Sequence, residues 1–292
     1  MHFWYKFFTY LFYPFSFFYL FIRILNKKED PKRYKEKLSK INVQKDEGFL
    51  IWFHVASVGE AMSILPLIEN FENDKNIKRI LITTITLSSA QILKKKYDYS
   101  KKIVHQFLPL DVPIFVNKFL NYWNPNLAIF IDSEIWPNLI FDIKKKNIPL
   151  LLVNARITKK TFLKWSLFKN FAKKIFEKFD LCIASSRETE DHLRSLGAKN
   201  IKSYGNLKFS RTKKEFNKKL DSNFIAQIKN KKIWCAASTH PTEEIFCAKT
   251  HLELKKTHND ILTIIIPRHI NRADEIYNEL SNLNLKVVKY TN

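Results

Sequence analysis

From Gly48 onward, short apolar runs alternate with longer segments whose apolar residues recur at helical spacing. The apolar runs predict β-strands and cover residues 49–56, 79–85, 103–108, 127–132, 148–153, 180–184 and 200–204. The segments between them predict helices and cover residues 60–71, 88–97, 112–122, 135–146, 160–178 and 187–196. Strands that alternate with helices favour a doubly wound α/β fold with a parallel sheet. We therefore predict a first Rossmann-like domain over residues 48–205.

The alternation stops in a polar, lysine-rich stretch and then resumes. Residues 206–230 are expected to form a linker, with room for one short helix. After it, "KIWCAAS", "ILTIIIP" and "LKVVKY" predict strands, and helices are expected to begin at Glu243 and Asn271. These elements predict a second, incomplete Rossmann-like domain over residues 231–292.

Residues 1–25 are the most apolar part of the chain. Charges interrupt the aromatic run only at Lys6 and Arg23, and Pro14 lies between them. The apolar stretch is shorter than the ~20 residues of a spanning helix, and aromatic side chains favour the headgroup interface. The basic residues that follow would stay on the cytoplasmic side and attract anionic lipid. We predict a membrane anchor or interfacial helix. The alternatives are a helix packed on the chain's own domain and a signal peptide, although no small-residue cleavage site is apparent.

The composition narrows the function classes. The net charge of +22 favours anionic partners, but no RNP, helix-turn-helix or zinc spacing supports a nucleic-acid binder. With four glycines, neither GxGxxG nor a Walker loop is present. The cysteines Cys182, Cys235 and Cys247 have no metal-binding spacing, so we predict no metal site and a reducing compartment. The first two are expected in buried strands.

Polar residues follow several predicted strands, at the edge where open α/β sheets bind ligands. They are His54, Ser57, Gly59 and Glu60; Asp132, Ser133 and Glu134; Asn154 and Arg156; Gly205, Asn206 and Lys208; Ser238, Thr239 and His240; Arg268 and His269. Glu60 alone is explained as a helix-start acid, and Ser238 or Thr239 as the N-cap of the next helix. Capping needs one such residue per helix. The recurrence of polar groups at five or more strands therefore favours a binding or catalytic site.

Together, these clusters resemble the 3-deoxy-D-manno-octulosonic acid (Kdo) transferases. The blocks "HVASVGE", "EIWPNLI", "NARI", "GNLKF", "AASTHPTEE" and "PRH" are each similar to a block of that family and follow the family's order. The resemblance implies a GT-B arrangement, in which two Rossmann-like domains face across a cleft. It implies inverting transfer of Kdo from CMP-Kdo to a lipid A precursor in lipopolysaccharide synthesis. That transfer would occur without a metal, at the cytoplasmic face of the bacterial inner membrane.

The resemblance also assigns roles to residues. Glu60 would be the general base that takes the proton from the attacking hydroxyl of the acceptor. Glu134 matches an acid of the family motif, whereas Asp132 stands where glutamate is usual and reaches one methylene less far. Asp132 and Lys208 would help to stabilise the transition state. The acceptor would bind to the first domain.

Arg268 and His269 would contact the CMP of the donor, because an arginine fork suits phosphate. The family's later glycine-rich segment and "HNPLE"-type block have no counterpart here, so the chain resembles a C-terminally truncated family member. We expect weak or no activity from this chain alone unless a partner supplies the rest. The alternative is a non-catalytic remnant that binds the lipid acceptor at the membrane without transferring sugar.

Overall fold

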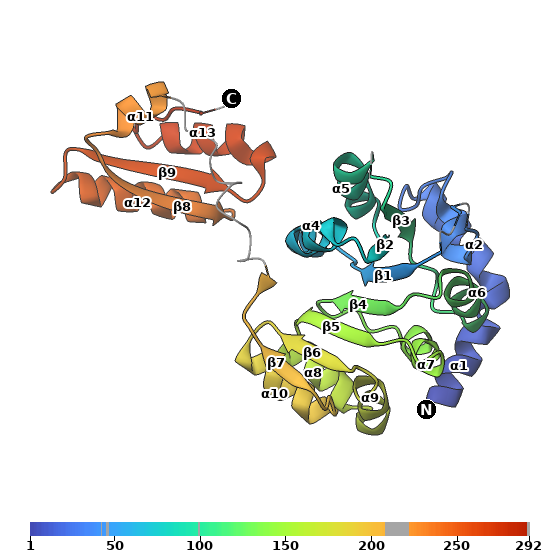
Figure 1. Cartoon of the computed structure of the whole chain (residues 1–292). Coiled ribbons are helices and arrows are strands. Elements are labelled where there is room, and N and C mark those ends of the chain that lie inside the picture. Colours follow the sequence, from blue (N-terminus) through green and yellow to red (C-terminus); the bar gives the residue numbers. More distant parts are fainter. Residues whose placement is uncertain (42, 45–46, 99, 208–221, 291–292) are drawn as a thin grey trace. The chain divides into compact units, whose positions relative to one another are not determined.

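The computed structural model describes residues 1–41, 43–44, 47–98, 100–207 and 222–290, and the chain divides into two compact units (Figure 1). The first unit comprises Met1–Thr212 and the second Lys213–Asn292.

The first unit is built on a seven-stranded sheet in the order β3-β2-β1-β4-β5-β6-β7. The strands are β1 (Phe49–His54), β2 (Ile77–Thr84), β3 (Ile103–Phe107), β4 (Leu127–Ile131), β5 (Leu150–Ala155), β6 (Leu181–Ala184) and β7 (Ile201–Ser203). Every neighbouring pair is parallel. The predicted α/β class and parallel sheet are confirmed. The strand order reverses between β1 and β4, and ligands bind at such a switch point in open α/β sheets.

Helices cover both faces of this sheet. They are α3 (Val58–Ser63), α4 (Leu65–Asn73), α5 (Leu87–Tyr97), α6 (Pro113–Trp123), α7 (Pro137–Lys145), α8 (Lys159–Ser166), α9 (Lys169–Phe176) and α10 (Arg187–Leu196). Side chains alternate between the faces of a strand, so Trp52 of β1 joins the core beneath α6 and α7. Its neighbours Ile51 and Phe53 join the core beneath α3, α4 and α5. Burial on both faces explains why the strands are apolar throughout.

Two predicted helices are each divided in the structure. The segment 60–71 forms α3 and α4, which meet at Ile64, and Pro66 lies in the first turn of α4. A proline is tolerated in that turn but not inside a helix. The segment 160–178 forms α8 and α9, which are separated at Leu167 and Phe168. The predicted strand positions agree with the structure to within a few residues.

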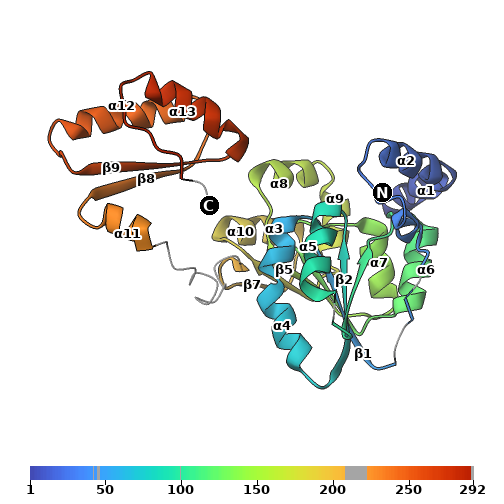
Figure 2. The same cartoon turned by 90° about the horizontal axis from the view of Figure 1, so that it is seen from above.

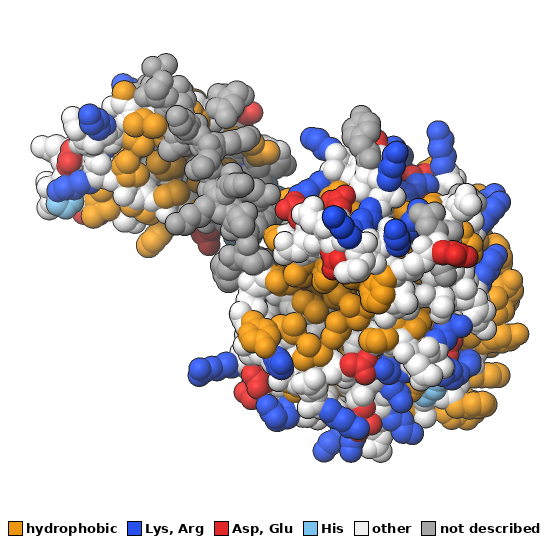
Figure 3. Space-filling view, viewed as in Figure 1, with side chains coloured by type: hydrophobic (Ala, Val, Ile, Leu, Met, Phe, Trp, Pro, Cys, Tyr) orange, Lys and Arg blue, Asp and Glu red, His pale blue; other side chains and the backbone are white. Residues whose placement is uncertain are grey.

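The N-terminal region forms two helices, α1 (His2–Leu11) and α2 (Tyr13–Leu25), followed by the short helix η1 (Tyr34–Leu38). One side of α1 is fastened to the unit, since the Tyr5 hydroxyl donates to Asp111 Oδ2 at 2.8 Å. The Asn138 amide donates to Thr9 Oγ1 at 2.8 Å. Most other aromatic side chains of the pair are exposed. Figure 3 shows them as an apolar strip along the right-hand edge, where α1 and α2 lie, with lysines and arginines beside it.

No single helix among the described residues is long and apolar enough to cross a membrane. The helices α1 and α2 pass that test only as a pair, by length and composition, and the chain bends by 63° between them.

The second unit contains α11 (Ser222–Ile228), β8 (Lys232–Thr239), α12 (Glu243–Lys255), β9 (Ile261–Pro267), η4 (Ile270–Arg272) and α13 (Ala273–Ser281). The two strands are parallel and form a sheet of their own. A third strand in "LKVVKY" was expected, and that prediction is wrong. Leu285 and Val287 instead pack on the apolar cluster of α12 and α13. Cys235 was expected to be buried but is exposed, because it lies on the same side of β8 as the exposed Ile233 and Ala237.

Candidate active site

Glu60 lies in the first turn of α3, directly beyond the carboxyl end of β1. Its Oε2 accepts the Ala56 N–H at 2.7 Å, and its Oε1 accepts the Ser57 hydroxyl at 2.7 Å. Ser57 is the N-cap of α3, and its Oγ accepts the Glu60 N–H at 3.3 Å. This reciprocal arrangement resembles a capping box. The residue as a whole is 9 % exposed, and the two hydrogen bonds hold its carboxylate in place.

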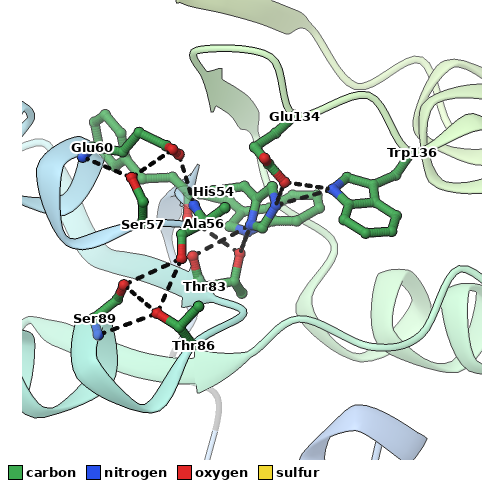
Figure 4. Close-up of polar contacts among 11 residues, drawn as sticks. His54, Ala56, Ser57, Glu60, Thr83, Thr86, Ser89, Glu134 and Trp136 are labelled. Atoms are coloured by element: carbon green, nitrogen blue, oxygen red, sulfur yellow. Dashed lines mark hydrogen bonds and ion pairs between the residues drawn. The ribbon is translucent and has the colours of Figure 1, made fainter. Parts of the chain in front are cut away.

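Glu134 follows β4, the neighbour of β1, and joins a cluster with His54 and Trp136. Its Oε2 lies 3.3 Å from His54 Nε2 and accepts the Trp136 indole N–H at 3.0 Å. The same indole N–H lies 3.2 Å from His54 Nε2. Figure 4 shows His54 between the Glu60 loop and the Glu134–Trp136 pair. Pairing of β1 with β4 thus brings residues that are about eighty positions apart into contact.

His54 is fully buried at the end of β1 and is held from its other side by β2. Its Nδ1 lies 3.0 Å from Thr83 Oγ1 and 3.3 Å from the Thr83 carbonyl oxygen. Because a carbonyl oxygen only accepts, a hydrogen on Nδ1 satisfies this contact and leaves Nε2 to accept from Trp136. Thr83 Oγ1 also accepts the Trp52 indole N–H at 2.8 Å. The histidine therefore links β1 and β2 to the segment between β4 and α7.

The loop that carries Glu60 is also fixed from the start of α5, the helix that follows β2. The hydroxyl groups of Thr86 and Ser89 each donate to the Ala56 carbonyl oxygen at 3.2 Å. Ala56 therefore accepts two bonds through its carbonyl and donates one to Glu60, as Figure 4 shows. A carboxylate held by such a loop has little freedom to reorient, which is what a positioned proton acceptor requires.

Asp132 is the first residue after β4 and adopts the left-handed conformation, with a φ of 62°. Its backbone N–H donates to the Val153 carbonyl at 3.1 Å, and its own carbonyl accepts the Arg156 N–H at 3.2 Å. Asn154 nearby also has a positive φ, of 55°, and its Oδ1 accepts the Leu207 N–H at 3.0 Å. Aspartate and asparagine tolerate this region better than most residues. Asp132 and Glu134 therefore lie at the same strand end, but only Asp132 has the left-handed backbone conformation.

The remaining predicted residues are distributed over other parts of the chain. Lys208 lies outside the described residues. Arg268 and His269 directly follow β9 in the second unit, and both side chains are exposed. The Arg268 N–H donates to the Thr239 carbonyl at 2.9 Å, so this pair lies at the carboxyl ends of β8 and β9.

A buried ion pair beside Arg268 was not predicted. Glu244 is fully buried in the first turn of α12, and Arg272 donates to both of its carboxylate oxygens, at 3.0 and 3.3 Å. The Thr239 hydroxyl adds a third bond at 2.8 Å. Burial raises the pKa of Glu244, but these hydrogen bonds outweigh it and hold the pKa below its usual value. The block "HPTEE" drew attention to this turn, but nothing in it pointed to Arg272.

The predicted capping of this helix is wrong. The N-cap of α12 is Thr242, which makes no side-chain cap bond, and neither Ser238 nor Thr239 occupies that position. Thr239 bonds to Glu244 instead, while the His240 N–H is accepted by Glu243 Oε2 at 2.8 Å. The acids of the first turn thus bond to the segments around the helix start, and no side chain caps the helix itself.

These positions limit the chemistry. In the first unit two carboxylates, those of Glu60 and Glu134, lie at the switch point of the sheet, beside a buried imidazole. Each carboxylate oxygen has about two acceptor sites, so both Glu60 oxygens keep one after their bonds within the loop. Such a site can accept a proton from a hydroxyl group. Within the described residues, no three His, Cys, Asp or Glu side chains come together to hold a metal ion.

Comparison with known proteins decides the family. A family model described as 3-Deoxy-D-manno-octulosonic-acid transferase (kdotransferase) matches residues 32–211, which include Glu60 and Glu134. The chain belongs to the Kdo transferase family. A 3-deoxy-D-manno-octulosonic acid transferase of Rickettsia bellii is 40% identical over 272 residues, 93% of this chain and 64% of the relative. That of Haemophilus influenzae is 30% identical over 229 residues, 77% of this chain and 53% of the relative.

A probable mitochondrial 3-deoxy-D-manno-octulosonic acid transferase of Arabidopsis thaliana is 32% identical over 88% of this chain. The chain thus spans about half to two thirds of the length of the relatives that it matches. Together the family model and these relatives establish the family of the chain.

Solved structures support the fold. UDP-GlcNAc 2-epimerase of Neisseria meningitidis, bound to UDP-GlcNAc, matches with a TM-score of 0.56 and 13% identity, over 80% of this chain and 70% of that one. A glycosyltransferase of Rickettsia africae matches with a TM-score of 0.54 and 13% identity, over 82% and 67% of the two chains. At such low identity these matches speak only for the fold, which is GT-B-like.

Proposed function

We propose that this chain carries out inverting transfer of Kdo from CMP-Kdo to a lipid A precursor. The observation that carries the proposal is the Glu60 carboxylate at the switch point of the sheet, inside the region that matches the family. The Ala56 N–H and the Ser57 hydroxyl hold this carboxylate, and Glu134 lies across the same switch point.

In the proposed reaction Glu60 is the general base. It accepts the proton of the acceptor's sugar hydroxyl as that oxygen attacks the anomeric carbon of Kdo, and the bond from Kdo to CMP breaks. Glu134 is held by Trp136 at the same edge, where it can orient the acceptor. Lys208 is proposed to offset the negative charge that develops on CMP as it departs, and Asp132 the positive charge that develops on the sugar. The reaction is proposed to need no metal or other cofactor.

Arg268 and His269 are proposed to contact CMP. Both are exposed at the strand ends of the second unit, where phosphate can reach them. Arg272 nearby donates both of its hydrogen bonds to Glu244. Arg268, which directly follows β9, is therefore the better candidate to bind phosphate.

Attachment to the cytoplasmic face of the bacterial inner membrane is part of the proposal. Exposed side chains such as Phe8, Phe15 and Phe18, at 61%, 60% and 64% exposure, support it, because buried aromatic surface strengthens interfacial binding. Basic residues directly after α2, among them Lys27 and Lys28, would meet anionic headgroups.

A transfer assay tests the proposal. The purified chain is incubated with CMP-Kdo and a tetraacylated lipid A precursor in detergent, and the lipid is analysed by mass spectrometry. A mass gain equal to one or more Kdo units is the expected result. No gain, with the acceptor still bound, would contradict transfer and favour the alternative of an acceptor-binding protein without catalysis.

A further inference from the structure

Helix α8 packs on the first unit through aromatic side chains. It begins four residues after β5 ends at Ala155, and its N-cap Thr158 accepts the Thr161 N–H at 3.3 Å. On its inner side the Phe162 ring stacks on His192, with centroids 4.4 Å apart and an interplanar angle of 8°. Trp165 meets Phe176 edge-on at 5.7 Å. These contacts fix which side of the helix faces outward.

The outward side of α8 is apolar as well. Leu163 is 55% exposed, Leu167 78% and Phe168 50%. An open hollow of about 650 Å³ runs along this side and is lined by Lys159, Lys160, Leu163, Lys164 and Leu167. The outward apolar side chains of α8 do not contribute to its packing on the first unit. Exposed apolar groups that are surrounded by polar ones mark interaction surfaces.

The stretch of chain that carries this side is basic. From residue 143 to residue 176 the chain contains lysines and Arg156 but no aspartate or glutamate. Lys160 and Lys164 are one turn apart, as are Leu163 and Leu167, so ammonium groups and apolar side chains share one side of the helix. Lysine stems can lie along apolar surface while their heads reach outward. On a membrane, the lysine cations would pair with anionic headgroups, and the apolar side chains would contact the acyl chains.

The position of α8 favours a lipid surface as its partner. It starts at the carboxyl edge of the sheet, and α1 is fastened to that edge through Asp111 and Asn138. Figure 2 shows α8 and the α1–α2 pair on the same side of the first unit. The exposed aromatic strip and the α8 surface can therefore approach one plane.

We propose that the outward side of α8 is a second membrane contact, which lies on an anionic lipid surface. Lys159, Lys160 and Lys164 contact lipid phosphates, and Leu163 and Leu167 enter the boundary between headgroups and acyl chains. This inference rests on the proposed attachment through α1 and α2. Two separate contacts fix the orientation of the unit, so that the Glu60 edge faces the membrane that holds the acceptor.

Three chains with one exposed cysteine each test the proposal. In a Cys235→Ser background, where the other two cysteines are buried, an environment-sensitive dye is attached after Phe8→Cys, Leu167→Cys or Asn73→Cys. Asn73 ends α4 at the opposite edge of the sheet and is the matched control. With vesicles of phosphatidylglycerol and phosphatidylcholine, dyes at 8 and 167 should shift to blue and brighten roughly two-fold or more. The dye at 73 should not change.

The outcomes separate the two proposals. A shift at position 8 without one at 167 would overturn the α8 contact and leave attachment through α1 intact. No shift at either position would overturn both. Changing Lys159, Lys160 and Lys164 together to glutamine should abolish the shift at 167, whereas the same change at Lys94, Lys95 and Lys96 of α5 should not. An unchanged shift in the α8 triple variant would overturn the role of its lysines.

Discussion

At the scale of single residues, the Glu60 carboxylate combines a structural position with a chemical one. It caps the loop that precedes α3 through Ala56 and Ser57, and the same bonds aim it at the switch point between β1 and β4. A helix-start acid is commonplace. The proximity of Glu134 and the restraint on the loop from Thr86 and Ser89 are what distinguish this one.

Asp111 is a second acid whose environment has a measurable consequence. Burial raises its pKa to about 6, although Tyr5 and the N–H groups of Asn138 and Leu139 donate to it, and nearby Asp142 raises it further. Because the folded chain then holds this proton more tightly than the unfolded chain does, Asp111 lowers the unfolding free energy as the pH rises from about 4 to about 6.

We predict that Asp111→Asn removes this dependence. Relative to the variant, the wild-type chain should gain on the order of 2 kcal/mol of unfolding free energy when the pH falls from about 7 to about 4.5. Denaturant unfolding of both chains at the two pH values measures it, with exposed Asp98→Asn as control. If the unfolding free energies of the variant and the wild type differ by the same amount at both pH values, the pKa of Asp111 is not raised.

At the scale of elements, a buried ion-pair network joins α2 to the loop that follows β2. Glu29 Oε1 accepts Arg23 Nε at 2.6 Å and Lys37 Nζ at 2.8 Å, and its side chain is 1% exposed. Lys37 Nζ also donates to the Ile85 carbonyl at 3.0 Å, next to the Thr86 that restrains Ala56. Burial lowers the pKa of Lys37 even though Glu29 acts to raise it.

Removing one partner should be costly, because it leaves a buried charge uncompensated. We predict that Glu29→Gln lowers the unfolding free energy by about 3 kcal/mol and speeds amide exchange over residues 26–40. Glu47→Gln, at an exposed site, is the matched control and should have little effect. Restoration of stability by the double variant Glu29→Gln/Lys37→Met would support the explanation. A Glu29→Gln chain as stable as the control would refute it.

The strands of the first unit were predictable because burial on both faces makes them continuous apolar runs. The segment "LKVVKY" has a similar pattern for a different reason, since Leu285 and Val287 pack on helices. Pro66 signals the break at Ile64, although the apolar periodicity continues across it, whereas the break at Leu167 has no such signal in the sequence. Candidate residues could be chosen from strand ends, but the contact of His54 with Glu134 depends on which strands pair, and no local pattern encodes that.

At the scale of the whole molecule, charge and exposed aromatic surface act together. The chain has 50 Lys and Arg against 28 Asp and Glu, which draws it toward anionic surfaces. Charge alone is weakened by salt, whereas aromatic side chains in the interface are not. Attachment that survives moderate salt would therefore depend on α1 and α2.

We predict that the chain floats with vesicles containing phosphatidylglycerol in a density gradient. The triple variant Phe8→Ser/Phe15→Ser/Phe18→Ser should reduce binding on the order of 10⁴-fold, because each buried phenyl ring contributes ~2 kcal/mol. Phe246→Ser, which removes a ring that is 73% exposed in the second unit, is the control and should float like the wild type. Equal flotation of the triple variant would contradict attachment through these helices.

The most direct test of the central claim compares transfer by the wild-type chain, Glu60→Gln and Glu69→Gln. Glutamine at position 60 keeps one acceptor for the loop and should cost about 1 kcal/mol of stability, but it cannot take a proton. Glu69 is an exposed acid paired with Lys96 and serves as control. We predict normal transfer of Kdo for Glu69→Gln and a loss of about 10²-fold or more for Glu60→Gln. Transfer by a folded Glu60→Gln chain at the wild-type rate would contradict the account.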